Sequence, residues 1–328
     1  MDRRKFIQSG IALGTTVSAP ALVLAQSASA KWPSQPVQLV VAFSPGGSTD
    51  VTARIISAKL MDIIGQRIVV LNKPGGGSNI GAEFAAKSPA DGYTLFLGTV
   101  SNAINMSLYK NLRYNLLTDF VPISSTTSSP ALLVCSSKLP VRTVQELIKL
   151  AKERPGKMNN ASSGVGTIPH LAGELFKNRF GLDITHIAYK GAAAALNDIA
   201  SGVTDFGFTS ALSSIPSIQA GRLTPLAVAS SKRLALLPNV PTMAEAGIVD
   251  FEITFWNGLF APAGTPREII DRLSAACASI ANMKEVEEIF AAQASVVTSS
   301  TPEEYKEFLT AEIKMWGDVV RLTGASAN

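Results

Sequence analysis

The sequence is poor in the residues that hold metals and disulfides. Its 328 residues include two cysteines, Cys135 and Cys277, and two histidines, His170 and His186. No Cys-x-x-Cys pair occurs, so we expect no metal site. Cys135 stands in a strand-like run and Cys277 in a helical one. An oxidising compartment would permit a disulfide between them, but we expect two buried, unpaired thiols.

Motifs of common enzyme classes are also missing. There is no Gly-x-Ser-x-Gly nucleophile elbow, and a Ser/His/Asp triad would have to use His170 or His186, which no spacing supports. A dinucleotide fingerprint and a phosphate-binding loop are absent as well, which disfavours a nucleotide. We predict a capping or packed role for His170, with a position facing the crevice as the alternative, and a core position in a strand for His186. We expect a protein that is not an enzyme and uses no cofactor.

Long apolar runs are absent after the first thirty residues, so no later segment reads as a membrane span. Met1–Ala30 has a basic start (Arg3-Arg4-Lys5), an apolar middle and small residues at its end, the pattern of a secretory signal cleaved near Ala30. The basic start resembles a twin-arginine signal, and general secretion is the alternative. We expect a mature periplasmic protein that begins at Lys31.

Charge of one sign is not in excess. The whole chain has 29 basic and 25 acidic side chains, and charged residues are 16% of the total. Removal of Met1–Ala30 takes away three basic residues and one acidic residue, which leaves a net charge of about +2. No basic cluster with interleaved aromatic residues occurs, so we expect no nucleic-acid partner.

What the chain does have is an alternation of short apolar runs with amphipathic helices, which predicts an α/β fold with parallel strands. We predict two lobes, each a mainly parallel sheet flanked by helices. Residues 31–131 and 256–328 form lobe 1, and residues 132–255 form lobe 2. Strand-like segments near 131–135 and 255–261 join them as hinges. A ligand crevice would lie beyond the carboxyl ends of the strands and close by hinge bending.

Two glycine-rich turns stand in the same context, one in each predicted lobe. Ser44-Pro-Gly-Gly-Ser-Thr-Asp50 separates a strand over 37–43 from a helix over 49–64, and Ser162-Ser-Gly-Val-Gly-Thr167 separates a strand over 158–161 from a helix over 169–179. Backbone N–H groups at a helix start suit an anion. We therefore predict that both turns contact an anionic ligand, although a plain strand-to-helix connection is the alternative.

Polar residues Thr99, Ser101 and Asn102 follow a third strand over 93–97, so they should lie on the same rim as the first turn. Hydroxyl and amide groups can bind a carboxylate without supplying charge, and helix capping is the alternative. Asp50 would repel an anion and can pair with Arg54 four residues on, so we give it a structural or water-mediated role.

Two aromatic residues, Phe208 and Trp256, stand at strand ends near the expected crevice. Core packing is the default interpretation for both, and contact with a ligand is the alternative.

A set of short motifs runs through the mature chain in a characteristic order. These motifs are Trp32-Pro33, Pro45-Gly46-Gly47 with Asp50 and Arg54, Asn72-Lys73-Pro74-Gly75, Asn79-Ile80-Gly81, Asp91-Gly92-Tyr93-Thr94, Ser163-Gly164, Gly166-Thr167 with His170-Leu171, Tyr189-Lys190-Gly191, Pro241-Thr242, Glu245-Ala246-Gly247 and Trp256-x-Gly258-Leu259-x-Ala261-Pro262. Together they resemble the Bug-type extracytoplasmic solute receptors of tripartite tricarboxylate transporters.

The resemblance implies a two-lobed, type II periplasmic-binding-protein clamshell that captures a small carboxylate for a membrane permease. Di- and tricarboxylates, acidic amino acids and aromatic acids are the implied ligands, and we expect a monomer. A module that presents the same carboxylate to a membrane sensor kinase is the alternative.

The resemblance also implies that backbone N–H groups and waters hold the carboxylate, without a basic side chain. The implied binding residues are Ser44, Pro45, Gly46, Gly47, Thr99, Ser101, Asn102, Ser163, Gly164, Gly166, Thr167, Gly191, Ala192 and Asp205. The alanine run Ala192–Ala195 departs from the pattern of this family, which leaves the size and polarity of the distal pocket open.

Overall fold

The structure is a computed structural model that describes residues 32–292 and 294–327. The predicted signal, Met1–Ala30, lies outside the described residues. The chain from Trp32 onward forms one compact unit. Among the helices of the described part, none is both long enough and apolar enough to cross a membrane.

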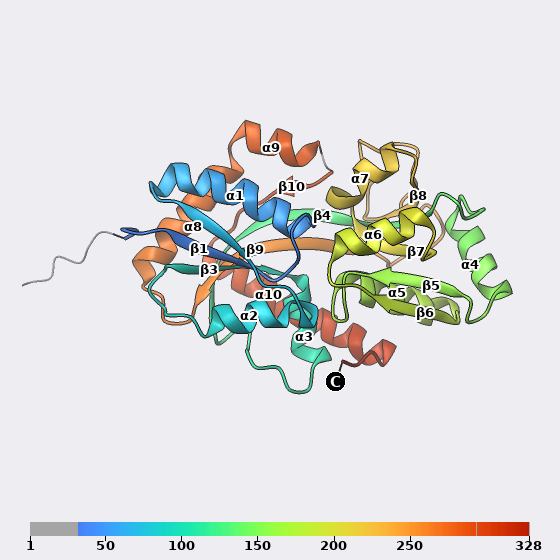
Figure 1. Ribbon diagram of the computed structural model, residues 1–328, viewed down its shortest axis with the longest axis horizontal. Coiled ribbons are helices and arrows are strands. Elements are labelled where there is room, and N and C mark those ends of the chain that lie inside the picture. Colours follow the sequence, from blue (N-terminus) through green and yellow to red (C-terminus); the bar gives the residue numbers. More distant parts are fainter. Residues whose placement is uncertain (1–31, 293, 328) are drawn as a thin grey trace, which may run out of the picture. The chain divides into compact units, whose positions relative to one another are not determined.

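Strands and helices alternate along the described chain (Figure 1). The strands are β1 (Val37–Val41), β2 (Ile68–Asn72), β3 (Thr94–Thr99), β4 (Phe120–Ser136), β5 (Met158–Ser162), β6 (Ile184–Ala188), β7 (Phe206–Ser210), β8 (Leu223–Ala229), β9 (Thr254–Pro262) and β10 (Val296–Val297). The helices are α1 (Ser48–Ile64), α2 (Asn79–Ala86), α3 (Val100–Leu108), α4 (Val144–Glu153), α5 (Ile168–Phe180), α6 (Ala192–Ser201), α7 (Ala211–Gln219), α8 (Arg267–Ala281), α9 (Lys284–Ala291) and α10 (Pro302–Thr323), with a 3₁₀ turn at Gly76–Ser78.

All ten strands are connected through hydrogen bonds in the order β2-β1-β3-β9-β4-β7-β5-β6, with β8 and β10 also paired to β4. Strand β4 links the two parts of the sheet, because its first part pairs with β9 and its last residues, Ala131–Ser136, pair with β7 and β8 (Figure 1). The β1–β2, β1–β3, β5–β6 and β5–β7 pairs are parallel, and pairs that involve β4 or β9 are antiparallel. The α/β class is confirmed, with a mixed sheet.

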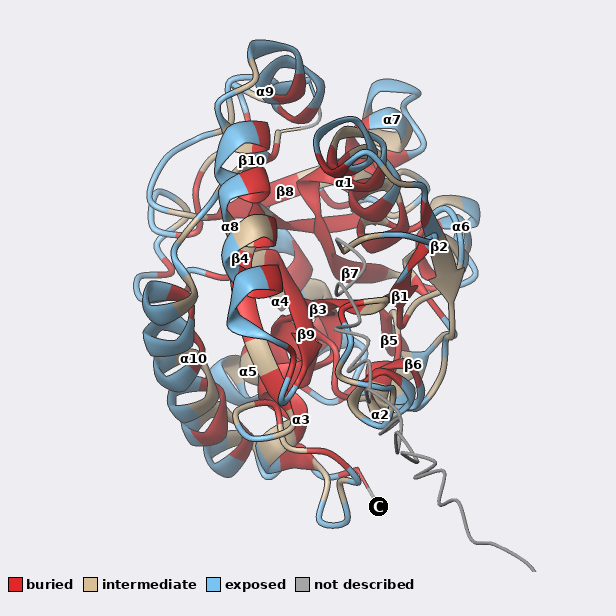
Figure 2. Cartoon of the chain, turned by 90° about the vertical axis from the view of Figure 1, so that its left-hand side faces the viewer, coloured by how far each residue is buried: buried red, intermediate tan, exposed pale blue. Residues whose placement is uncertain are grey.

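Helices cover both faces of the sheet, and the alternation of side chains along the strands explains the two cores. Leu39 and Val41 of β1 pack in one cluster with residues of α1, α8 and α9, whereas Val40 points to the other face and packs with α2, α3 and α10. Figure 2 shows buried strands and helices whose outer faces are exposed. Helices α5 and α6 pack on β5 and β7 in the second part of the sheet.

Two elements differ from the prediction. Strand β4 begins at Phe120, whereas the sequence predicted a strand only over residues 131–135, and helix α3 was not predicted. The predicted lobe boundaries fall inside β4 and β9, the strands that run between the two parts of the sheet. These boundaries stay a prediction.

Candidate functional site

A cavity of about 60 Å³ lies between strand ends and helix starts from both parts of the sheet. Residues from the N-terminal ends of five helices contribute to its wall. They are Ser48 and Thr49 of α1, Val100 and Ser101 of α3, Ile168 and Pro169 of α5, Ala192 of α6, and Ser210 and Ser213 at the start of α7. The positive ends of five helix dipoles therefore border one small space, which favours a negatively charged ligand.

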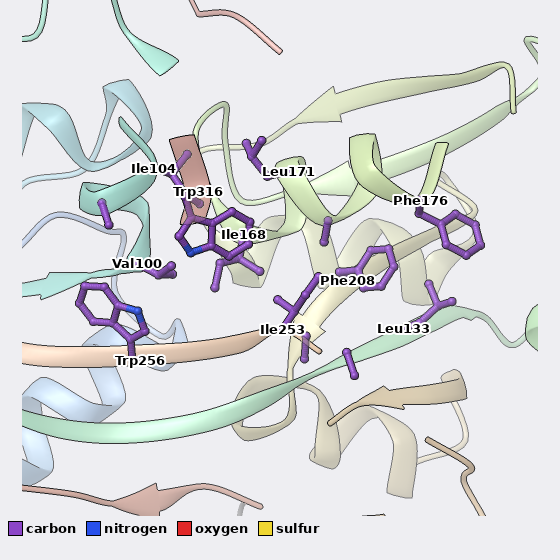
Figure 3. Packing of buried hydrophobic residues seen from close by; sticks show 14 of the residues in the cluster. Val100, Ile104, Leu133, Ile168, Leu171, Phe176, Phe208, Ile253, Trp256 and Trp316 are labelled. Atoms are coloured by element: carbon purple, nitrogen blue, oxygen red, sulfur yellow. The ribbon is translucent and has the colours of Figure 1, made fainter. Parts of the chain in front are cut away.

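The wall of this cavity contains no charged side chain and no histidine among the described residues. Its polar groups are hydroxyls, the Asn257 amide and backbone atoms. Its apolar part includes Val100, Ile168, Phe208 and Trp256. In Figure 3, Val100 and Trp256 lie on one side of Ile168 and Phe208 lies on the other. An anion held here would be bound by neutral donors, next to an apolar surface for a carbon skeleton.

The helix starts differ in how their first N–H groups are satisfied. Thr99 accepts a hydrogen bond from the Ser101 N–H at 3.2 Å, and Ser210 accepts one from the Ser213 N–H at 3.3 Å, so α3 and α7 are capped by side chains. Helices α1, α5 and α6 carry no side-chain cap. Since the first N–H groups of a helix lack partners within the helix, these three helix starts are suited to donate to a ligand.

Asp50 does not line the cavity but holds the loop between β1 and α1 in place through hydrogen bonds. Its buried carboxylate accepts hydrogen bonds from the Gly46 N–H (3.0 Å), the Arg54 guanidinium (2.9 and 3.1 Å) and the Asn72 amide (2.9 Å). Burial raises the pKa of Asp50, but the hydrogen bonds from Arg54, Gly46 and Asn72 outweigh it and hold the pKa below its usual value. The predicted pairing of Asp50 with Arg54 is confirmed.

Half of the predicted binding residues lie in the cavity wall. They are Ser44, Gly47, Thr99, Ser101, Ser163, Thr167 and Ala192. The predicted residues that are not part of this wall are Pro45, Gly46, Asn102, Gly164, Gly166, Gly191 and Asp205. Pro45 and Gly46 are exposed, and the Gly46 N–H is already bonded to Asp50. Gly46 therefore supports the loop through Asp50.

Asn102 and Asp205 are placed by internal hydrogen bonds. The Asn102 side chain accepts from the Thr99 N–H at 2.9 Å and donates to Tyr114, which is the capping role that was the alternative for this residue. Asp205 precedes β7, and its carboxylate accepts from the Asn159 N–H at 2.7 Å. Because the cavity receives Thr209 and Ser210 from the other end of β7, Asp205 lies away from it.

The second glycine turn rests on a pair of stacked histidines. The His170 and His186 rings are 4.2 Å apart at 28°, the Gly166 N–H donates to His170 Nδ1, and Ser162 Oγ lies 2.6 Å from His186 Nε2. Burial, then the charge of His186, lowers the pKa of His170 to about 3. Burial, then Lys177, lowers the pKa of His186 to about 4. The packed role predicted for His170 is confirmed, and it lies outside the cavity wall.

Sequence reasoning missed the part of the wall that β7 and α7 supply. Thr209, Ser210 and Ser213 line the cavity, but no glycine marks this strand-to-helix turn, unlike the two turns that the sequence pattern indicated. The serine that caps a helix directly after a buried strand is the signal that could have revealed it. Phe208 and Trp256 are both buried, which confirms the packing role predicted for them. Both also line the cavity, and their contact with a ligand stays a prediction.

Both cysteines are buried and unpaired, as predicted. Burial raises the pKa of each thiol to about 12, so neither is a reactive thiolate at neutral pH. Neither cysteine lines the cavity, whose wall offers hydrogen-bond donors and apolar surface, the chemistry of a binding site.

Solved structures similar to this chain include two-lobed periplasmic binding proteins. A structure described as R. palustris Rpa4515 with adipate has a TM-score of 0.87 and 36% identity, and covers 90% of this chain and 99% of its own. MatC (Rpa3494) from Rhodopseudomonas palustris with bound malate has a TM-score of 0.84 and 29% identity, and covers 88% and 99%. The fold thus identifies the class of protein as a periplasmic solute-binding protein.

The family follows from the sequence comparisons. Residues 52–324 match the family described as "Tripartite tricarboxylate transporter family receptor", and the chain belongs to it. BugT of Bordetella pertussis is 40% identical over 296 residues, which cover 90% of this chain and 91% of BugT. The family consists of extracytoplasmic solute receptors and is not a class of enzymes. The resemblance inferred from the sequence motifs is confirmed.

Proposed function

We propose that this receptor captures a small carboxylate between its lobes and delivers it to a membrane permease of the tripartite tricarboxylate type. The observation that carries the proposal is the convergence of five helix N-termini on a cavity without a charged side chain in its described wall. A carboxylate gains N–H donors and favourable dipoles in this place, each dipole contributing roughly 0.3–1 kcal/mol. A cation would gain no hydrogen bonds from N–H donors and would be repelled by the positive ends of the helix dipoles.

The uncapped helix starts divide between the two parts of the sheet. Helix α1 follows β1 in the first part, whereas α5 and α6 follow β5 and β6 in the second. A carboxylate that accepts from both sides would hold the two parts together. The apolar wall formed by Leu196, Phe208 and Trp256 would take the carbon skeleton. Relatives whose structures contain adipate and malate support this ligand class.

A panel of ligands tests the proposal by thermal denaturation of the mature protein. Adipate, malate, citrate, glutamate and benzoate are each added at millimolar concentration, with adipamide as the uncharged control. A ligand at a thousand times its Kd adds about 4 kcal/mol to the unfolding free energy, which raises Tm by several degrees. We expect at least one carboxylate to raise Tm and adipamide to leave it unchanged. A panel without any shift would refute the proposal.

We also propose that the protein reaches the periplasm through the signal at Met1–Ala30 and acts there as a monomer. The intact mass of protein extracted from the periplasm should correspond to a chain that begins at Lys31, and light scattering should give the mass of one chain. A periplasmic protein that retains residues 1–30 would contradict the predicted cleavage.

A further inference from the structure

A second concave site lies beside β9 and shares Trp256 with the cavity. This site, which we call the acid–aromatic groove, has a volume of about 400 Å³ and lies between β4, β9 and α10. Its lining residues are Ser125, Thr127, Ser128, Thr254, Trp256, Thr298, Ser300, Glu304, Tyr305, Phe308 and Glu312. Hydroxyl, carboxylate and aromatic groups therefore make up its wall.

Three aromatic rings meet at the groove. Trp256 lies edge-on to Tyr305 (6.1 Å, 88°) and to Phe308 (5.6 Å, 75°), while Tyr305 and Phe308 stack at 6.1 Å. Phe308 is 42% exposed, although Trp256 and Tyr305 are buried. An exposed aromatic surface backed by buried rings can bind a cation through the negative faces of the rings.

The charge of the groove has one sign. Glu304 and Glu312 lie in its wall, and none of its described lining residues is basic. Glu312 Oε2 accepts hydrogen bonds from the indole N–H of Trp256 (2.6 Å) and of Trp316 (3.2 Å), and no described residue forms an ion pair with this carboxylate. Burial raises the pKa of Glu312. A half-buried carboxylate with neutral donors only would gain from a cation beside it.

Tyr305 forms part of the buried base of the groove. Its hydroxyl is fully buried, has no hydrogen-bond partner in the described structure, and lies over Gly258. An unpaired buried hydroxyl costs free energy unless a donor or acceptor reaches it. Because this hydroxyl is buried against Gly258, a cation in the groove would contact the two carboxylates and the exposed Phe308 ring, and not this hydroxyl.

Helix α10 extends the surface beyond the groove. Phe308, Met315 and Leu322 are seven residues apart, are 42%, 45% and 63% exposed, and therefore lie along one face of the helix. A small free cation would use only the groove, whereas a protein segment could cover both the groove and this apolar stripe. The stripe is what favours a protein as the occupant.

We propose that the acid–aromatic groove docks an arginine or lysine side chain of a protein partner whose neighbouring apolar residues cover Phe308 and Met315. A guanidinium can stack on the exposed ring and donate to the carboxylates at the same time. The inference does not depend on which ligand fills the cavity. Trp256 lines both the cavity and the groove, so a docked partner contacts a residue that also borders the ligand site.

The test uses the mature protein and two capped tripeptides, acetyl-Leu-Arg-Leu-amide and acetyl-Leu-Gln-Leu-amide. The probes carry no carboxylate, so they do not compete for the proposed cavity ligand. The chain has three tryptophans, and their indole N–H signals in ¹H–¹⁵N spectra report on binding. We expect the arginine peptide to shift the Trp256 and Trp316 signals with at least fivefold higher affinity than the glutamine peptide.

Matched variants locate the binding. Glu312→Gln keeps an oxygen that can accept from both indoles but removes the charge, and should weaken the arginine peptide at least fivefold. Glu307→Gln removes the same charge from an exposed position of α10 outside the groove and should bind like the wild type. Phe308→Ala changes an exposed side chain and should also weaken binding, which guards against misfolding of the first variant.

Three outcomes would overturn the inference. The first is equal binding of the two peptides, or binding of neither at millimolar concentration. The second is a Glu312→Gln protein that is folded and binds the arginine peptide like the wild type. The third is tetramethylammonium binding as tightly as the arginine peptide, which would make the groove a site for small cations. If the wild-type protein binds the arginine peptide but none of the carboxylates in the ligand panel, the proposed function is refuted and the docking inference is not.

Discussion

The hydroxyl of Ser44 donates a hydrogen bond to the carbonyl oxygen of Lys190 at 2.7 Å. This bond joins the loop after β1 to the loop after β6, two segments almost 150 residues apart in the sequence. Gly191 follows Lys190 with a φ of +148°, a backbone conformation that favours glycine, and a Cβ at this position would be in ordinary contact with Ser44 at 3.4 Å. The two parts of the sheet thus meet at the edge of the cavity.

Replacement of Ser44 by alanine should weaken ligand binding more than it weakens the fold. One hydrogen bond of this kind contributes about 0.5–1.5 kcal/mol, so we expect roughly a two- to tenfold rise in Kd. Calorimetric titration with the tightest carboxylate of the panel measures it. Ser230→Ala is the matched control, because Ser230 donates to the Lys232 carbonyl within its own exposed loop. Equal affinities of the two variants would show that the Ser44–Lys190 bond does not support the bound state.

Replacement of the two adjacent glycines of the first loop should affect different properties, stability at Gly46 and ligand affinity at Gly47. Gly46 has φ +84°, so Gly46→Ala forces a left-handed conformation that costs about 1–2 kcal/mol of unfolding free energy. Gly47 has φ −81°, and an added Cβ would lie 3.8 Å or more from its neighbours. Gly47→Ala should therefore leave stability nearly unchanged but lower ligand affinity, because Gly47 lines the cavity. Urea denaturation and titration separate these effects; a Gly47→Ala protein with wild-type affinity would contradict this role.

A larger side chain at the start of α6 should block the cavity. Ala192 lines the cavity, and its Cβ lies 3.9 Å from the place a Cβ on Gly47 would take. We expect Ala192→Leu to weaken carboxylate binding more than tenfold while the protein stays folded. Ala194→Leu makes the same change at an exposed position of α6 outside the wall and should bind normally. Similar affinities for the two variants would contradict the assignment of the cavity as the ligand site.

The stacked histidines should make stability depend on pH. The pKa values of about 3 and 4 lie below the value of about 6.5 for an unfolded histidine, so the unfolded chain binds more protons in between. The unfolding free energy should therefore fall as pH drops from 7 to 5, by up to about 1.4 kcal/mol per pH unit for each histidine. The chain has two histidines in all, so urea denaturation of untagged His186→Gln protein should give a shallower slope. An unchanged slope would contradict the half-buried, neutral state of this ring.

Much of the fold could be predicted because local patterns and burial agree in β1, β5 and the helices that follow them. The first part of β4 could not. Residues 124–129 are all serine or threonine, with Pro122 and Pro130 on either side, and this segment is held by pairing with β9 across a long sequence separation. Helix α3 was hidden in a similar way, because Thr99, Ser101 and Asn102 suggested a polar loop, whereas the structure uses Thr99 and Asn102 as a capping box.

In the candidate site, too, residues marked by local sequence patterns could be predicted, and residues placed by long-range contacts could not. The glycine turns located Gly47 and Thr167, because glycines with positive φ stand beside them at Gly46 and Gly166 and both residues precede helix starts. The Gly46 N–H could not be assigned, since its bond to Asp50 depends on how the loop folds back on the helix. Thr209 lines the cavity because β7 pairs with β4 in the sheet, and strand order cannot be read from local sequence patterns.

Calorimetric titration of the mature protein with adipate and with adipamide tests the central claim most directly, because the two molecules share a carbon skeleton and differ in charge. Backbone donors at helix starts should bind the anion and discriminate against the neutral amide. We predict 1:1 binding of adipate, or of another carboxylate from the panel with its own amide, and at least a hundredfold weaker binding of the amide. Equal affinity for acid and amide, or no heat with any carboxylate, would contradict a carboxylate receptor.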